Sequence, residues 1–424
     1  MKRLIFFVFT LLSELALAQD YAVVIKGGHV IDPKNGIDAI MDVAIADGKI
    51  AKVAKTIDAQ GARQVVNAKG LYVTPGLIDL HAHVFFGTNL DQTYSNGPNA
   101  LPPDVFTFRN GVTTVVDAGC SGWRDFETFK KQTIDISQTR VLALLNIVGS
   151  GMRGGKFEQN IEDMDSEKTA EMAKRYPDQV VGVKLAHFNG YDWTPTDRAV
   201  AAGKLADVPV MIDFGGSKPT LSIEELYLKH LRPGDIYTHC FGQLGSREPI
   251  VDVATKQVKP FVWEAQKKGI IFDVGYGGIS FAFSQAIPAL KSHFYPNTIS
   301  TDIHTGSMNN AMKDMLNVMS KFMAMGMDLP SVIKASTWSS AQAIKRPQLG
   351  HLTEGAVADV AILNLENGRF LARDVTPFGF FDYTGYKVEG KQKLSCEMTI
   401  RNGKIVYDLN GIANPVVVTQ RPRS

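Results

Sequence analysis

The sequence predicts an α/β protein, a TIM (β/α)8 barrel joined to a small β-sandwich that both ends of the chain build. Three observations predict this architecture. Short alternating strands with tight turns fill both ends of the chain, apolar strand-like runs alternate with helical stretches through the middle, and ligand-type side chains follow several of those runs. Alternating strands and helices are typical of parallel sheets, and eight such units are what a closed barrel requires.

The first eighteen residues, MKRLIFFVFTLLSELALA, predict a secretory signal peptide. Lys2 and Arg3 give a basic start, an apolar stretch follows, and the segment ends on a small-x-small pattern before Gln19. A membrane anchor is the alternative, but the apolar stretch is short and Glu14 interrupts it. We therefore expect residues 1–18 to be removed and the mature protein to be exported, periplasmic or secreted, without a membrane span.

Both ends of the mature chain have the pattern of β-structure. Short alternating runs such as YAVVIKGGHVID and DVAIADGKIAKVA near the start match VADVAILNL and CEMTIRNGKIVYDLNG near the end. Asp-Gly and Asn-Gly pairs between them are typical of hairpin turns. We expect residues 19–73 and 350–424 to form one composite β-sandwich domain beside a barrel of residues 74–349.

The middle of the chain contains eight apolar runs of strand length, separated by amphipathic helical stretches such as DSEKTAEMAKRY and NNAMKDMLNVMSKFMAMG. A doubly wound open sheet is the alternative, but no glycine-rich phosphate fingerprint follows the first run. The predicted barrel strands are Leu77–His83, Val112–Ala118, Val141–Ile147, Val180–Ala186, Val208–Asp213, Asp235–Cys240, Ile270–Gly275 and Thr298–Asp302.

Composition excludes several classes of partner. The formal net charge is only +2, so the sequence gives no sign of the basic surface that binds nucleic acid or an anionic membrane. Three scattered cysteines, with no CxxC pair, do not make a disulfide scaffold and are expected to be small core residues. The sequence leaves the oligomeric state open, and a homo-oligomer is compatible with it.

The segment GLIDLHAHVF places His81 and His83 one residue apart at the end of an apolar run. Side chains at alternate positions of a strand leave the same face, so both imidazoles can bind one metal ion. Asp79 shares that face and is a candidate to orient one imidazole through its second nitrogen. The alternative is a pair of polar residues satisfied by hydrogen bonds at a strand end.

Other ligand-type residues follow later predicted strands. Lys184 lies near the end of the fourth and His239 near the end of the sixth, while Asp213 ends the fifth and Asp302 the eighth. Each has a structural alternative, since a lysine can extend to solvent, a histidine can lie in the core and an aspartate can cap a turn or helix. In a TIM barrel, however, all these strand ends meet at one mouth, which is where active sites lie.

These motifs resemble the amidohydrolase superfamily of metal-dependent hydrolases, in particular its deacetylase branch near the dihydroorotases. The resemblance covers nearly the whole mature chain. It rests on VTPGLIDLHAHVF, GVTTVVDAG, GVKLA, GDIYTHCF, GIIFDVGYGG, TISTDIH and STWSSAQAI…LGHLTEGAVADVAIL.

The resemblance implies a metal centre of one or two Zn²⁺ ions, with two favoured. His81 and His83 would hold the first metal, and His239 the second. Lys184 would react with CO₂ to give a carbamate that bridges both metals. Asp302 would bind the first metal and accept the proton of the attacking water. Asp213 stands where the family usually has a histidine, and its carboxylate would bind a second metal more weakly or not at all.

The resemblance implies a hydrolase for carbon–nitrogen or ester bonds, removing an N-acyl or O-acetyl group from a small acylated molecule by attack of metal-activated hydroxide. Cyclic amide hydrolysis, as in dihydroorotases and hydantoinases, and a catalytically weak ligand- or metal-binding barrel are the alternatives. Candidate substrate-contacting residues lie in the loops after the strands or replace family residues. They are Arg153, His187, Tyr276 (where the deacetylase branch more often has histidine) and His304.

Overall fold

The computed structural model describes residues 21–87, 97, 99–213, 219–245, 247–371 and 374–414. The predicted signal peptide, residues 1–18, lies outside these residues, so it and the expected export stay predictions. Within the described residues, no helix is long and apolar enough to cross a membrane.

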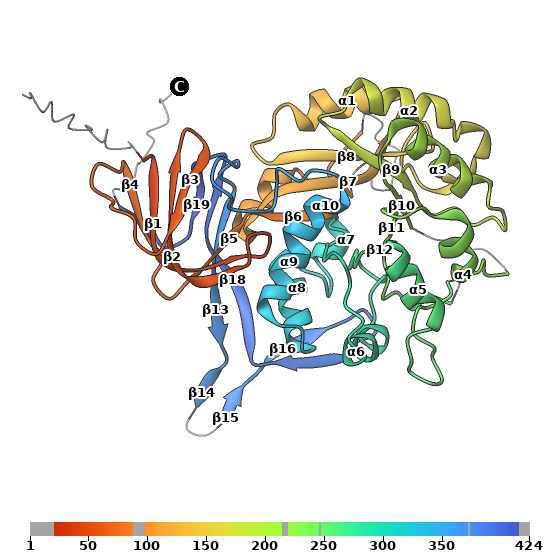
Figure 1. Cartoon of the computed structure of the whole chain (residues 1–424). Coiled ribbons are helices and arrows are strands. Elements are labelled where there is room, and N and C mark those ends of the chain that lie inside the picture. Colours follow the sequence, from red (N-terminus) through yellow and green to blue (C-terminus); the bar gives the residue numbers. More distant parts are fainter. Residues whose placement is uncertain are drawn as a thin grey trace, which may run out of the picture.

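The two ends of the chain meet in one nine-stranded sheet, drawn at the left of Figure 1. Its main path runs β19-β18-β13-β5-β1-β2-β3, and β4 pairs with β1 and β20. The ends join where β13 runs antiparallel to β5, with Ala361 opposite Thr74. The strands are β1 Val23–Asp32, β2 Ile37–Ala46, β3 Lys49–Ala54, β4 Gln64–Asn67, β5 Tyr72–Pro75, β13 Val360–Asn367, β18 Gln392–Arg401, β19 Lys404–Asp408 and β20 Ala413–Asn414.

Hairpin turns form where the sequence places Asp-Gly and Asn-Gly. Asp47-Gly48 connects β2 to β3, Asn402-Gly403 connects β18 to β19, and all four residues have positive φ. That backbone geometry matches the twist of the flanking strands. The sheet encloses its own apolar core, which draws side chains such as Val23, Val43 and Met398 from both chain ends.

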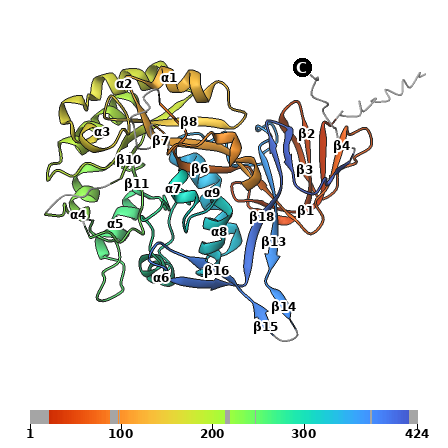
Figure 2. The same ribbon diagram turned by 180° about the vertical axis from the view of Figure 1, so that it is seen from behind.

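The middle of the chain forms a curled parallel sheet whose strands follow chain order from β6 to β12. Helices surround it (Figures 1 and 2). The strands are β6 Leu77–Ala82, β7 Val112–Gly122, β8 Arg140–Asn146, β9 Val180–Leu185, β10 Val210–Ile212, β11 Ile236–Tyr237 and β12 Ile271–Phe272. The helices are α1 Phe126–Phe129, α2 Ser166–Arg175, α3 Thr194–Ala206, α4 Ile223–Glu225, α5 Pro260–Lys268, α6 Phe283–Lys291, α7 Thr305–Met308, α8 Met315–Ala324, α9 Leu329–Ser336 and α10 Trp338–Ala343.

The eighth predicted barrel strand, Thr298–Asp302, lies in the expected place but is not a regular strand. Single parallel bridges, Asp273 to Thr298 and Ala82 to Ile303, connect this segment to the seventh and first strands and close the barrel. Side chains replace part of the ladder here, because the Thr301 amide donates to the Asp79 carboxylate at 3.0 Å. Asp302 also has a left-handed backbone, with φ of 52°, which ends the extended conformation.

The segment between β13 and β18, together with β18 itself, reaches the barrel. Two hairpins, β14 Arg369–Leu371 with β15 Asp374–Thr376 and β16 Phe378–Phe381 with β17 Lys387–Gly390, leave the terminal sheet (Figure 1). Asp382 accepts a hydrogen bond from the Phe283 amide at the start of α6. Ser320 of α8 accepts one from the Leu394 amide of β18. Part of the predicted sandwich segment 350–424 thus packs on the barrel.

Candidate metal centre

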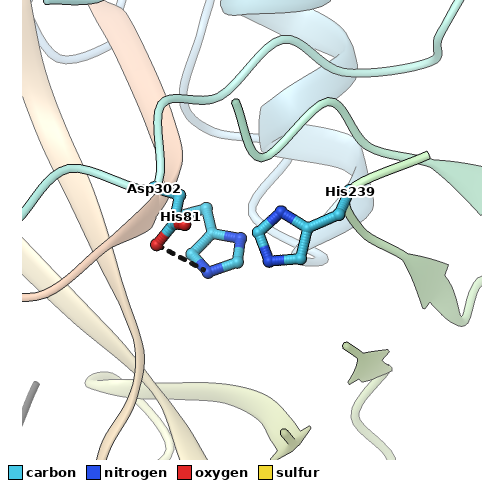
Figure 3. Close-up of side chains that lie close together, drawn as sticks. All are labelled: His81, His239 and Asp302. Atoms are coloured by element: carbon cyan, nitrogen blue, oxygen red, sulfur yellow. Dashed lines mark ion pairs between the residues drawn. The ribbon is translucent and has the colours of Figure 1, made fainter. Parts of the chain in front are cut away.

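Three residues from three separate barrel segments form a cluster that can bind a metal ion. Ligand atoms of His81, His239 and Asp302 all lie within 4.8 Å of one another, and all three side chains are buried. Figure 3 shows the two imidazoles and the carboxylate converging. His81 lies on β6, His239 follows β11, and Asp302 ends the segment that closes the barrel. Imidazole nitrogens with a carboxylate oxygen are a donor set that suits zinc.

His83 lies beside this cluster on the same face as His81. The Asp302 Oδ1 atom is 2.8 Å from His83 Nε2 and 3.4 Å from His81 Nε2. The ring centroids of the two histidines are 5.4 Å apart. Burial acts to raise the pKa of Asp302, but these imidazoles outweigh it and hold that pKa well below its usual value. The carboxylate therefore stays ionised.

Two glycines of the DVGYGG segment let the chain approach the cluster closely. A Cβ atom at Gly275 would lie 2.3 Å from Thr238 Oγ1, and one at Gly277 would lie 2.5 Å from Asp302 Oδ2. The backbone at His239 is left-handed, as it is at Asp302. Strained backbone of this kind persists where surrounding contacts hold it, and it concentrates at functional sites.

A buried relay orients His81. Its Nδ1 atom lies 3.0 Å from the Thr238 hydroxyl, which donates to Asp273 Oδ2 at 2.8 Å. This leaves Nε2 of His81 to face the cluster. The sequence assigned the orienting role to Asp79, and that assignment is wrong. The Asp79 carboxylate instead accepts from the Thr301 amide and hydroxyl and from the backbone amide of His81, and not from an imidazole nitrogen.

Lys184 lies inside the barrel beside His81. Its Nζ atom is 3.4 Å from His81 Nε2 and 3.5 Å from the Met211 sulfur, and the side chain is fully buried. Burial lowers the pKa of this ammonium. A neutral amine is the form that reacts with CO₂, so the surroundings of Lys184 fit carbamate formation.

Asp213 lies beside His239 of the cluster and contacts a cation. Its Oδ2 atom is 3.4 Å from His239 Nε2 and 3.4 Å from His187 Nε2, while Oδ1 accepts a hydrogen bond from Arg247. Burial acts to raise the pKa of Asp213, but His239 and Arg247 outweigh it and hold that pKa well below its usual value. Sequence analysis did not identify Arg247, because it lies in a loop rather than at a strand end. Its position shortly after the sixth strand was the signal available.

A pocket of about 400 Å³ opens over the cluster. Its lining includes His187 and His304 of the four candidate substrate residues. The His187 Nδ1 atom is 3.1 Å from the carboxylate of Glu158. Burial acts to lower the pKa of His187, but Glu158 and then Asp213 outweigh it and raise that pKa. His304 accepts a hydrogen bond from the Gly306 amide at the start of α7, and its ring centroid is 6.1 Å from that of His83.

The other two candidate substrate residues lie outside the pocket lining. The Arg153 guanidinium stacks on the Phe157 ring, 4.0 Å from its centroid. The Tyr276 hydroxyl donates to the Phe381 carbonyl at 2.9 Å and accepts from Lys321 at 2.8 Å. Tyr276 therefore connects the barrel to the C-terminal hairpin, and its hydroxyl is directed to that contact instead of to a substrate.

Comparison with known proteins gives consistent matches. The profile of the Amidohydrolase family matches residues 283–406. A deacetylase of Enterococcus faecalis is 32% identical over 400 residues, covering 92% of this chain and 100% of that protein. A deacetylase of Brucella anthropi is 31% identical over 351 residues, covering 80% of this chain and 82% of that protein. Among solved structures, an adenine deaminase has a TM-score of 0.80 at 29% identity, covering 92% of this chain and 100% of that chain.

Proposed function

The chain belongs to the amidohydrolase family of hydrolases, and on this premise we propose that it removes an acyl group from a small N-acyl amide or O-acyl ester. One observation carries the proposal. Ligand atoms from His81, His239 and Asp302 converge within 4.8 Å at the floor of a pocket. The deacetylase relatives, which match most of the chain, favour acyl transfer to water over the cyclic amide hydrolysis considered above.

The metal ion is proposed to be zinc, held by His81, His83, His239 and Asp302. When bound, zinc would polarise the scissile carbonyl and lower the pKa of water, which supplies a nucleophile at neutral pH. A carbamate on Lys184 would add an anionic oxygen donor to this cationic site. The fit of the donor set to zinc, and the burial that lowers the pKa of Lys184, support these assignments.

Asp302 is proposed to transfer the proton. Its carboxylate stays ionised and faces the same space as the imidazoles. An ionised carboxylate within hydrogen-bond reach of the attacking water can accept its proton, and can then donate that proton to the leaving nitrogen or oxygen. The adjacent Gly277 leaves room for the carboxylate to occupy this position.

The pocket supports a small substrate. Its volume of about 400 Å³ lies near the lower end of ordinary ligand sites. His187, His304 and Arg247 give it hydrogen-bonding groups, and Met152, Leu244 and Ile279 give it an apolar wall. A compact molecule with one acyl group and both polar and apolar parts suits this lining and volume.

A substrate panel with metal analysis tests the proposal. The purified enzyme is assayed with acetylated amino acids, acetylated hydroxy acids, cyclic amides and adenine, before and after chelation. We expect turnover of an acylated compound, loss on chelation, recovery with Zn²⁺, and a loss of about 10²–10⁴-fold in kcat for Asp302→Asn. The matched control is Asp58→Asn, an exposed aspartate in the loop between β3 and β4, which keeps wild-type kcat.

Two outcomes would contradict this function. If the enzyme turned over only cyclic amides or only adenine, its activity would be that reaction and the proposed acyl hydrolysis would be wrong. Bound metal without Asp302-dependent turnover of any compound would favour the binding barrel considered in the sequence analysis.

A further inference from the structure

The contact between Asp213 and Arg247 places a permanent positive charge in the pocket. Arg247 is 8% exposed, its guanidinium donates to Asp213 Oδ1, and it lines the same pocket as the metal cluster. The other carboxylate oxygen, Oδ2, is 3.4 Å from His239 Nε2. The Asp213 carboxylate thus contacts the guanidinium of Arg247 through one oxygen and the imidazole of His239 through the other.

A second metal ion does not fit this arrangement. The resemblance to the family would place that ion between His239, Asp213 and a carbamate on Lys184. One oxygen of Asp213 already binds the guanidinium, whose charge cannot be titrated away in a protein. A divalent cation on Asp213 would lie next to that charge in a buried site, where repulsion between like charges is strong. The arginine supplies the compensating charge that the carboxylate needs.

The charge of the guanidinium acts on the pocket. Its Nε and Nη1 atoms are buried and have no hydrogen-bond partner among the described residues, while the residue as a whole lines the pocket. A guanidinium with few hydrogen bonds and little contact with water is only weakly screened, so its positive charge is felt strongly by a nearby anion.

We propose that the enzyme uses one metal ion, and that Arg247, held in place by Asp213, takes the position of a second cation. Its positive charge stabilises the negative charge that develops on the acyl oxygen of the substrate in the pocket that Arg247 lines. The inference rests on the proposed acyl hydrolysis and assigns the second electrophilic group of the same site. A fixed charge near a developing oxyanion lowers the barrier because it needs no rearrangement during the reaction.

Metal stoichiometry tests the inference without reference to activity. The purified protein is reconstituted with excess Zn²⁺ and bicarbonate, desalted, and analysed for zinc per chain. We expect one zinc in the wild type and in Arg247→Lys, which keeps the charge. Arg247→Met frees the Asp213 carboxylate, and the double variant Asp213→His with Arg247→Met offers an imidazole in a site without the guanidinium. Both are expected to bind close to two.

Control variants separate a change in the number of bound zinc ions from damage to the fold. Arg140→Met also removes a guanidinium from a largely buried ion pair, with Asp359, but away from the pocket, so it should bind one zinc. Thermal unfolding shows which variants are folded. The kinetic readout is taken at one equivalent of zinc. Loss of the charge that stabilises the oxyanion should lower kcat of Arg247→Met by about 10²–10³-fold, more than it raises KM.

The outcomes are distinguishable. Two zinc ions in the wild type would overturn the inference and leave the proposed acyl hydrolysis intact. One zinc in every folded variant would also overturn it, because the guanidinium would not be what excludes the second ion. No zinc in the wild type would overturn the proposed function and this inference together.

Discussion

Replacing Thr238 with valine tests whether the relay from Asp273 through Thr238 to His81 positions a metal ligand. Valine has nearly the same shape as threonine but lacks the hydroxyl. The hydroxyl lies 3.0 Å from His81 Nδ1 and donates to Asp273 Oδ2 at 2.8 Å, and the side chain has no exposed surface. The variant therefore removes two buried hydrogen bonds without creating a large cavity.

The expected magnitudes follow from those two contacts. Each lost hydrogen bond contributes about 1 kcal/mol, and the buried ring nitrogen left without a partner adds about 1–3 kcal/mol, so we expect about 3–5 kcal/mol of destabilisation. Metal affinity should fall about 10–100-fold, because the imidazole is no longer fixed in the orientation and tautomer that directs Nε2 to the metal.

Competition with a chromophoric zinc chelator measures the metal affinity, and chemical denaturation of the metal-free protein measures the stability. The matched control is Thr298→Val, because Thr298 donates to the other oxygen of Asp273 at 2.6 Å. We expect Thr298→Val to lower stability but to leave zinc affinity within about twofold of wild type. Equal zinc affinities for wild type and Thr238→Val would refute the relay.

Three further outcomes are expected. Gly277→Ala should lower zinc affinity and kcat at least about tenfold, since its Cβ would lie 2.5 Å from Asp302 Oδ2 and its φ is +61°. The control Gly61→Ala also has a positive φ, but its Cβ meets nothing within 4 Å and it lies outside the pocket lining, so it should leave both unchanged. Burial lowers the pKa of Lys321 to about 7, so the folded state gives up a proton that the unfolded state keeps between pH 7 and about 10. The free energy of unfolding of the wild type should therefore rise with pH over this interval relative to that of Lys321→Met, by about 4 kcal/mol at most. Denaturation at a series of pH values measures both proteins, and the same pH dependence in the two would contradict this. Removing the Tyr276 hydroxyl with Tyr276→Phe should destabilise the protein by about 1–3 kcal/mol while leaving KM unchanged. A raised KM would instead indicate that this hydroxyl contacts the substrate.

Much of the fold could be predicted from local sequence pattern. Parallel strands buried on both faces are apolar, so Val180–Leu185 is recognisable as β9 from sequence alone. The Asp47-Gly48 and Asn402-Gly403 turns were predictable for a similar reason, because few residues adopt positive φ at low cost. The irregular backbone of the closing segment after Thr298 was harder to predict, because the hydrogen-bond partners of this backbone include the Asp79 side chain, which is far away in sequence.

The candidate site also has one part that the sequence predicted and another that it did not. His81 and His83 alternate on a strand, and the ends of parallel strands meet at one mouth, so the sequence by itself determined which ligand types gather there. Only the tertiary structure decided the directions of the remaining side chains. It paired the Asp79 carboxylate with Thr301 and made Thr238 the partner of the His81 imidazole.

Arg247 and Tyr276 show the physical reason. Arg247 reaches the pocket from a loop whose path depends on packing, and Tyr276 is drawn toward Phe381, a residue 105 positions later in the chain. Strand periodicity is local and repeats every two residues, so sequence carries it. The partner of a buried loop side chain depends on which distant segment the fold brings to it, and local sequence does not encode that contact.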